Sequence, residues 1–215
     1  PFSAEAYDNS TIETGGPSSE TNNSEFFNAH GNDDGFAEYG VADFSTSDLG
    51  VSFTVGNVNS ASLELTHSEP FFADDGTVDI WLASDTSRSI DDGTLGFDDT
   101  IIGGIASSSG DFGNLTLLAS GAFVTGNDGV TDTFAFTLDA TTEPLLINAI
   151  NTGQIRMVVS AHTDTTAATY AGFDHRTYYG PTLNVDVTAI PEPATMTVLG
   201  LGGLAMALRR RKVGA

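Results

Sequence analysis

The side chains that could do chemistry in this sequence are carboxylates and four histidines, because the chain contains no cysteine. Without cysteine, disulfides, thiol catalysis, thiolate zinc sites and iron–sulfur clusters are excluded. The histidines are His30, His67, His162 and His175, and none stands in a metal-binding spacing such as His-Glu-x-x-His. The sequence also has no Gly-x-Ser-x-Gly nucleophile elbow and no phosphate-binding or dinucleotide-binding loop.

Carboxylates are far more numerous than cations. Residues 1–190 contain 28 acidic residues and three arginines, a formal charge of −25. A body of this charge repels nucleic acid and anionic lipid headgroups, so we predict no nucleic-acid partner. Two carboxylates at a suitable separation could hydrolyse a glycosidic bond, but the sequence singles out no such pair. We therefore predict that the protein is not an enzyme, with a glycoside hydrolase or other hydrolase as the alternative.

Calcium is the metal that acidic loops suit best, because it takes about six to eight oxygen ligands from carboxylates and carbonyls. The candidate ligands are three pairs of adjacent residues: Asp74, Asp75, Asp91, Asp92, Asp98 and Asp99. The alternative is that these residues only shape turns. Asp-Gly is typical of hairpin turns, and no loop has the Asp-x-Asp-x-Asp-Gly spacing of an EF-hand.

Candidate ligand contacts lie in two places: Trp81, and the group Asp174, His175, Arg176 and Tyr178. Trp81 stands between Ile80 and Leu82 in an alternating segment, so its ring lies on the opposite face from theirs. It is either an exposed platform for a sugar ring or, as we favour, covered by a loop or a second sheet. The alternative for the second group is a surface loop with one ion pair.

The elements that position these residues are mainly strands. Alternating apolar residues predict strands at 61–66, 78–82, 133–138, 154–160 and 182–187. Further strands are expected near 26–30, 36–44, 51–55, 100–105 and 112–124. A helix of about two turns begins at Thr142-Glu143-Pro144 and ends at Gly153. Repeated Asp-Gly turns between the strands predict an all-β fold, an antiparallel β-sandwich or jelly roll with one short helix.

The chain divides into three parts by composition. Residues 1–24 are polar and predict a low-complexity segment with at most one strand, residues 25–188 form the sandwich, and residues 189–215 form a distinct tail. The sequence starts at Pro1 without a recognisable signal peptide, from which we expect that a leader has been cleaved or left out.

The tail has the composition of a membrane segment. Ala194 to Leu208 is a stretch of 15 residues without a charge, and Arg209, Arg210, Arg211 and Lys212 follow. A helix of this length rises about 22 Å, which is short of a bilayer core of roughly 30 Å. Snorkelling arginines and local thinning close part of the gap. The positive-inside rule then leaves the acidic body outside. The alternatives are a core helix of the domain and an amphipathic helix; the segment is apolar on all sides, which disfavours a surface helix.

The tail resembles the PEP-CTERM sorting signal. The resemblance lies in the order of three parts: Pro191-Glu192-Pro193-Ala194-Thr195, a Gly- and Leu-rich helix, and the closing Arg-Arg-Arg-Lys. It implies export, transient retention in the inner membrane and processing by an exosortase near Pro-Glu-Pro. It further implies a Gram-negative host that makes extracellular polysaccharide. Pro191, Glu192 and Pro193 would be the recognition motif, and the basic cluster would stop transfer through the membrane.

The body distantly resembles exported jelly-roll modules found beside carbohydrate-active domains. The resemblance lies in Val58 to Leu65 after an early strand, the helix at 143–152, and Phe173-Asp174-His175-Arg176 followed by Gly180-Pro181-Thr182-Leu183. Three functions remain open: a surface or extracellular-matrix protein, a calcium-supported carbohydrate-binding module, and a hydrolase. An exposed aromatic strip would favour the second function, and a cleft with paired carboxylates the third.

Overall fold

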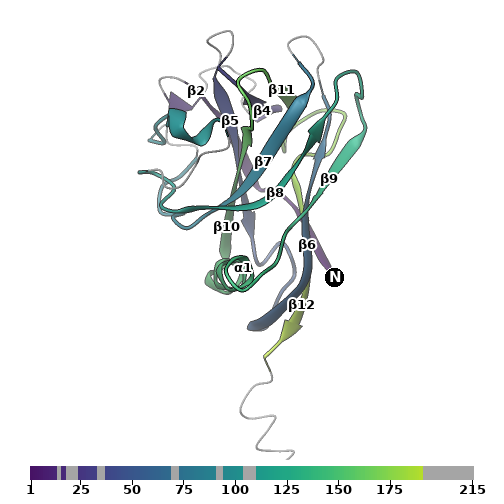
Figure 1. Cartoon of the computed structure of the whole chain (residues 1–215). Helices are drawn as coiled ribbons and strands as arrows, with labels where there is room; N and C mark the ends of the chain where they lie inside the picture. The colour runs from purple at the N-terminus through teal and green to yellow at the C-terminus, as the bar shows by residue number, and fades with distance from the viewer. Residues whose placement is uncertain are drawn as a thin grey trace, which may run out of the picture.

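The computed structural model describes residues 1–13, 16–17, 24–32, 37–68, 73–90, 94–103 and 110–190 (Figure 1). Its elements in chain order are β1 (Phe2–Glu5), β2 (Asp8–Glu13), β3 (Gly16–Pro17), β4 (Phe26–His30), β5 (Glu38–Ser45), β6 (Val55–Thr66), β7 (Gly76–Ala83), the 3₁₀ turn η1 (Asp99–Ile101), β8 (Leu115–Phe123), β9 (Thr131–Ala135), α1 (Thr142–Thr152), β10 (Gln154–Ala161), β11 (Ala167–Ala171) and β12 (Thr182–Ala189).

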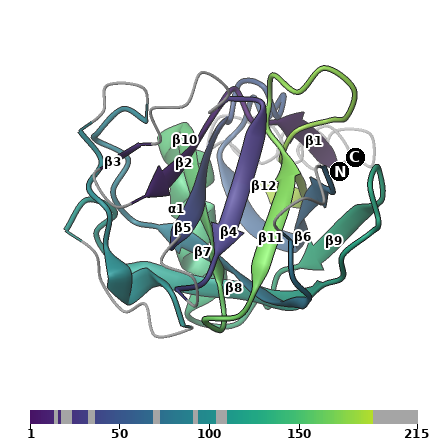
Figure 2. The same ribbon diagram turned by 90° about the horizontal axis from the view of Figure 1, so that it is seen from above.

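The strands form two antiparallel sheets that face each other. The smaller sheet has the order β1-β12-β6-β9. The larger has the order β11-β4-β5-β10-β7-β8, and β2 pairs with β5 and with β3. Seen from above, the two sheets lie on opposite sides of the molecule (Figure 2). The predicted antiparallel sandwich with one short helix is confirmed, whereas the predicted C-terminal helix lies outside the described residues.

The main core lies between the sheets, where the alternation read from the sequence places its apolar side chains. Leu63 and Leu65 of β6 and Met157 and Val159 of β10 are fully buried in it. A second core covers the outer face of the larger sheet, where Trp81 packs with residues of the segment after β7, among them Phe112. The larger sheet is therefore buried on both faces, which explains why every residue of β10 after Gln154 is buried.

The helix α1 is positioned by its first turn and its end. The carboxylate of Asp139 accepts hydrogen bonds from the backbone N–H groups of Thr141 (2.7 Å) and Thr142 (2.8 Å), so it satisfies donors that the helix leaves open. Gly153 ends the helix with φ of 97°, a conformation that favours glycine. The predicted helix end at Gly153 is confirmed, and the helix is one turn longer than expected.

The structure differs from the sequence-based expectation in five segments. No strand was predicted where β11 lies, and the strand predicted at 133–138 ends at Ala135. Residues 1–13, expected as part of a loose leader, form β1 and β2 and pair with both sheets. Residues 51–54 form no strand, because β6 begins at Val55. Residues 99–101 form a 3₁₀ turn, and the remainder of the strand expected at 100–105 lies partly outside the described residues.

Candidate functional site

The tail leaves the body directly from a central strand. β12 is paired on one side with β1 and on the other with β6, from Thr182↔Glu64 to Ala189↔Val55. The residue after it, Ile190, donates its backbone N–H to the carbonyl of Thr54 at 2.8 Å. The folded body thus continues to the residue before Pro191. Pro191, Glu192 and Pro193, and the cluster Arg209, Arg210, Arg211 and Lys212, lie outside the described residues.

The first part of β6 pairs with the end of β12 along one edge and is hydrogen-bonded to α1 along the other. The side chain of Asn151 accepts from Val55 N–H at 2.8 Å and donates to the Val55 carbonyl at 3.0 Å, as a neighbouring strand would. Glu143 accepts from Val58 N–H at 3.1 Å. Because β9 pairs only with Ser62 to Thr66, these two side chains satisfy backbone groups of β6 that would otherwise face the helix unpaired.

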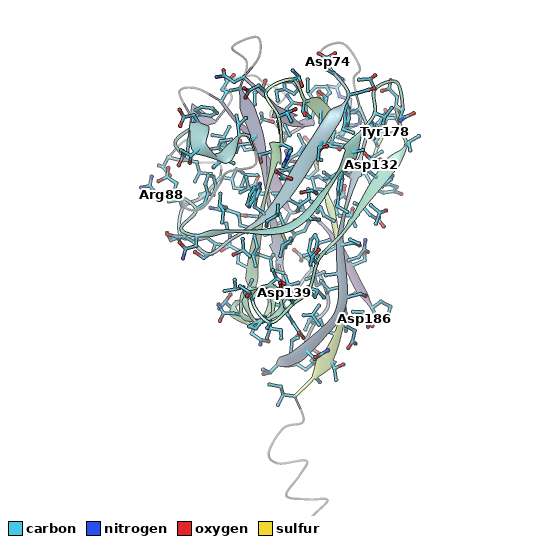
Figure 3. All side chains as sticks on the ribbon, in the orientation of Figure 1. Asp74, Arg88, Asp132, Asp139, Tyr178 and Asp186 are labelled. Carbon is cyan, nitrogen blue, oxygen red and sulfur yellow. The ribbon has the colours of Figure 1, made fainter. Side chains whose placement is uncertain are left out.

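Two aspartates of the predicted calcium loops, Asp75 and Asp98, accept hydrogen bonds from threonines. Asp75 accepts from the backbone N–H (2.7 Å) and the hydroxyl (2.9 Å) of Thr125, and these hydrogen bonds, the backbone one first, lower its pKa. Asp74 pairs through its backbone with Ala167, at the same end of the molecule as the labelled Tyr178 (Figure 3). These hydrogen bonds link the residue before β7 to the segment after β8, 50 positions along the chain.

Asp98 has the turn role that was the alternative to calcium. Asp98 is the N-cap of η1, and its carboxylate accepts from the backbone N–H (3.0 Å) and the hydroxyl (2.6 Å) of Thr100. Asp99 is exposed in the first turn, and Asp91 and Asp92 lie outside the described residues. Within the described ranges, no three side chains of His, Asp or Glu lie close enough together to hold a metal ion. Calcium binding stays a prediction.

Trp81 is covered, as we favoured. Its side chain is buried in the second core, and its indole N–H donates to the hydroxyl of Ser160 at 2.9 Å. A buried ring with a satisfied N–H is a packing element, so Trp81 is not a platform for a sugar in this structure.

The loop between β11 and β12 brings the other candidate contacts together. His175 stacks on Tyr178, with ring centroids 5.2 Å apart and planes 9° apart, and accepts from the backbone N–H of Tyr178 at 3.0 Å. Arg176 pairs with Glu25 at 2.8 Å, the single ion pair expected for a surface loop, and Asp174 donates its backbone N–H to Ser24. Tyr179 is 79% exposed beside them.

The larger sheet also holds a buried ion pair that the sequence did not reveal. Arg156 on β10 donates to both carboxylate oxygens of Asp43 on β5, each at 2.7 Å, and neither residue is more than 2% exposed. Arg156 also donates to the carbonyl of Arg88 at 2.7 Å. The two residues are 113 positions apart and only strand pairing places them side by side. No spacing in the sequence could have indicated this.

Three histidines have carboxylate partners in the same way. The pairs are His30–Glu38 at 3.4 Å, His67–Asp132 at 2.6 Å and His162–Asp79 at 2.8 Å. The carboxylate of Asp79 also accepts from the hydroxyl of Ser120. Serine and histidine therefore both bind the aspartate and not each other, so this group lacks the serine–histidine contact that a nucleophilic triad needs.

A shallow cleft of about 310 Å³ lies between α1 and the segment after β7. Leu145, Asn148 and Thr152 line it from the helix, and Ser84 to Ser87 line it from the other side. Among the residues lining it, Asp85 is the only carboxylate, and hydrogen bonds from Ser87 lower its pKa. A glycosidase needs two carboxyl groups about 5–10 Å apart, and this cleft offers one.

Within the described residues, no helix is long and apolar enough to span a bilayer. No curated protein matches the chain. The family model of the PEP-CTERM protein-sorting motif matches residues 189–212, which begin at the last residue of β12. The β-sandwich described above therefore carries a PEP-CTERM sorting motif directly at its end, and the protein is an exported protein targeted to an exosortase.

Proposed function

We propose that this protein is a non-catalytic component of the cell surface or extracellular matrix of a Gram-negative bacterium. The tail retains the precursor in the inner membrane, and the exosortase then processes it near Pro191–Pro193. The observation that carries the proposal is the PEP-CTERM motif at residues 189–212. The uncharged stretch of 15 residues and the basic cluster after it support membrane retention, for the physical reasons given above.

The surfaces of the body support a role without catalysis. The outer face of the smaller sheet carries small polar side chains in matched rows, such as Asn184 beside Ser62 and Glu64 beside Thr133. The outer face of the larger sheet is covered by its own second core. The one cleft described above has a single carboxylate. A solvated polar sheet face is what a stable spacer or matrix module needs.

Polysaccharide binding is the second candidate, and one observation favours it. Phe173 (37% exposed) and Tyr179 (79% exposed) flank the stacked His175 and Tyr178 on one loop. Exposed rings of this kind can stack on sugar rings. If the loop binds the host polysaccharide, Tyr179→Ala should weaken binding in a pull-down at least several-fold without changing the melting temperature. The matched control is Tyr7→Ala, because Tyr7 is another exposed tyrosine outside this loop.

Intact mass spectrometry in the native host tests the main proposal. The protein is purified from the wild-type strain and from a strain without the exosortase. We expect a mature chain ending near Pro191–Pro193 only where the exosortase is present. If the chain keeps Leu208 and the basic cluster in both strains, the tail is an ordinary anchor and the proposal is wrong.

A further inference from the structure

The structure leaves no linker between the body and the sorting motif. Ile190 is bonded to Thr54 through its backbone, and its side chain lies over Gly56, where a Cβ would come within 2.6 Å of Ile190 Cγ1. Because Gly56 has no side chain, Ile190 can pack against the start of β6. The chain is therefore fixed to the body up to the residue before Pro191.

This attachment limits how far the body can stand from the membrane. Four residue steps separate Ile190 from Ala194, the first residue of the uncharged stretch, and they span at most about 14 Å when fully extended. The headgroup layer on one side of a bilayer is roughly 5–7 Å thick. With Ala194 at the hydrocarbon edge, Ile190 therefore lies close to the headgroups.

Apolar side chains are exposed at this end of the body. Ile190 is 51% exposed, and Phe53, next to the Thr54 that binds Ile190, is 36% exposed. Phe53 contacts the ring of Phe2 edge to face, with centroids 5.9 Å apart. We call Phe53 and Ile190 the tail-end pair. They lie where β6 begins and β12 ends, at the end of the molecule that α1 also occupies (Figure 1).

Carboxylates lie at both ends of the body. At this end lie Asp48 in the loop 46–54, Glu143 in α1, which is bonded to Val58, and the labelled Asp139 and Asp186 (Figure 3). The labelled Asp74 and Asp132 lie toward the opposite end (Figure 3). An anionic headgroup layer repels the acidic body as a whole, so the apolar contacts of this end must offset that repulsion if it docks.

We propose that, in the tail-anchored precursor, the tail-end pair docks on the headgroup layer of the bilayer that holds the tail. The inference rests on the proposed membrane retention. It adds that the body does not tumble freely on its tether but stands with β12 pointing at the membrane. Docking in turn holds the sorting motif at the membrane surface, where the processing enzyme must reach it.

The test uses the full chain and the fact that it contains no cysteine. A single cysteine at exposed Ser52 carries an environment-sensitive fluorophore beside Phe53, and a cysteine at Tyr179 carries it on the loop before β12 as the control. The proteins are reconstituted into vesicles of phosphatidylethanolamine and phosphatidylglycerol that contain a headgroup-region quencher lipid. Flotation reports retention by the tail, and quenching reports contact of the labelled end. Emission of the buried Trp81 reports folding.

We expect the protein to float with the vesicles, and the probe at residue 52 to be quenched several-fold more than the probe at 179. If the protein floats but both probes are quenched equally little, docking on lipid is overturned while retention stands, and this end then faces a protein partner or water. If the protein does not float, membrane retention fails and the inference fails with it.

A longer tether separates docking from simple proximity. Eight Gly and Ser residues inserted between Ile190 and Pro191 allow the body to leave the surface. In this variant the probe at 52 should remain quenched, and F53S/I190S in the same variant should lose that quenching several-fold with unchanged flotation and Trp81 emission. If the lengthened chain loses quenching with the native Phe53 and Ile190 in place, these side chains do not bind the lipid and the proposal is wrong.

Discussion

The buried ion pair between Asp43 and Arg156 should be the polar contact on which the stability of the body depends most. Asp43→Ala removes a carboxylate that accepts two hydrogen bonds of 2.7 Å from Arg156 and a third, at 3.0 Å, from Gln154. Arg156 would keep its charge with only the Arg88 carbonyl as acceptor, because its Nη1 has no partner even in the native protein.

The expected magnitude follows from burial. Removing one partner of a buried pair leaves an uncompensated charge and typically costs about 3–5 kcal/mol of unfolding free energy. For a body of this size, about 2–4 °C of melting temperature is lost per kcal/mol, so the midpoint should fall by roughly 6–20 °C. Replacing both partners with apolar residues of similar size, Asp43→Leu with Arg156→Met, should cost far less than the single change, because no charge is left buried.

Urea unfolding of a chain ending at Ile190, followed through the emission of Trp81, measures these free energies. The matched control is Arg176→Ala, which breaks an arginine–carboxylate pair whose arginine side chain is 85% exposed and should cost about 0–1 kcal/mol. If Asp43→Ala costs less than about 1 kcal/mol, water reaches Arg156 in the variant and the buried-charge argument is refuted.

Three further predictions concern stability and register. Asp139→Ala should lower the melting temperature near neutral pH, because hydrogen bonds from Thr142 and Thr141 hold the pKa of Asp139 below its ordinary value of 3.8. The difference in melting temperature from wild type should shrink as the pH falls below that value. A difference that stays constant in melting scans across pH would contradict the capping role. Ser160→Ala leaves the indole N–H of Trp81 unpaired and should cost about 1–3 kcal/mol in urea unfolding, whereas no loss would mean that water replaces the hydroxyl. Asn57→Cys with Thr188→Cys should form a disulfide on oxidation, because these residues are Cα partners at the end of β12. Intact mass spectrometry detects the disulfide. Thiols that stay free would mean that β12 and β6 pair in a different register.

The strands that the sequence predicted well are those whose one buried face is apolar. In β6 and β12, buried residues such as Leu63 and Val185 alternate with polar ones, and the period of two identifies the strand. β2 escaped this reasoning because the residues it buries are mostly polar: Asn9, Ser10 and Thr11. Asn9 donates to the Phe26 carbonyl at 3.2 Å and accepts from Phe173 N–H at 2.6 Å, so hydrogen bonds replace the apolar signal.

Most of the candidate site residues proved harder to place than the strands. Alternation showed that Trp81 faces away from the main core, but only the fold shows that the segment after β7 builds a second core there. The sequence cannot distinguish two roles for the aspartate pairs, because a carboxylate that could bind calcium can equally cap a turn. The sorting motif was predictable because all its parts lie in one contiguous segment. The family match at residues 189–212 confirms this prediction.

The place of β12 connects folding to sorting. The smaller sheet cannot close without its last strand, because β12 lies between β1, from the start of the chain, and β6. These pairings join residues far apart in sequence, such as Phe2 and Val185, so they form only when nearly the whole body is available to fold. The sorting motif begins at the last residue of the same strand, so the sheet and the motif become available together. A body that fails to pair β12 would present the motif on a loose strand, and a body that pairs it presents the motif at a fixed end of a folded domain.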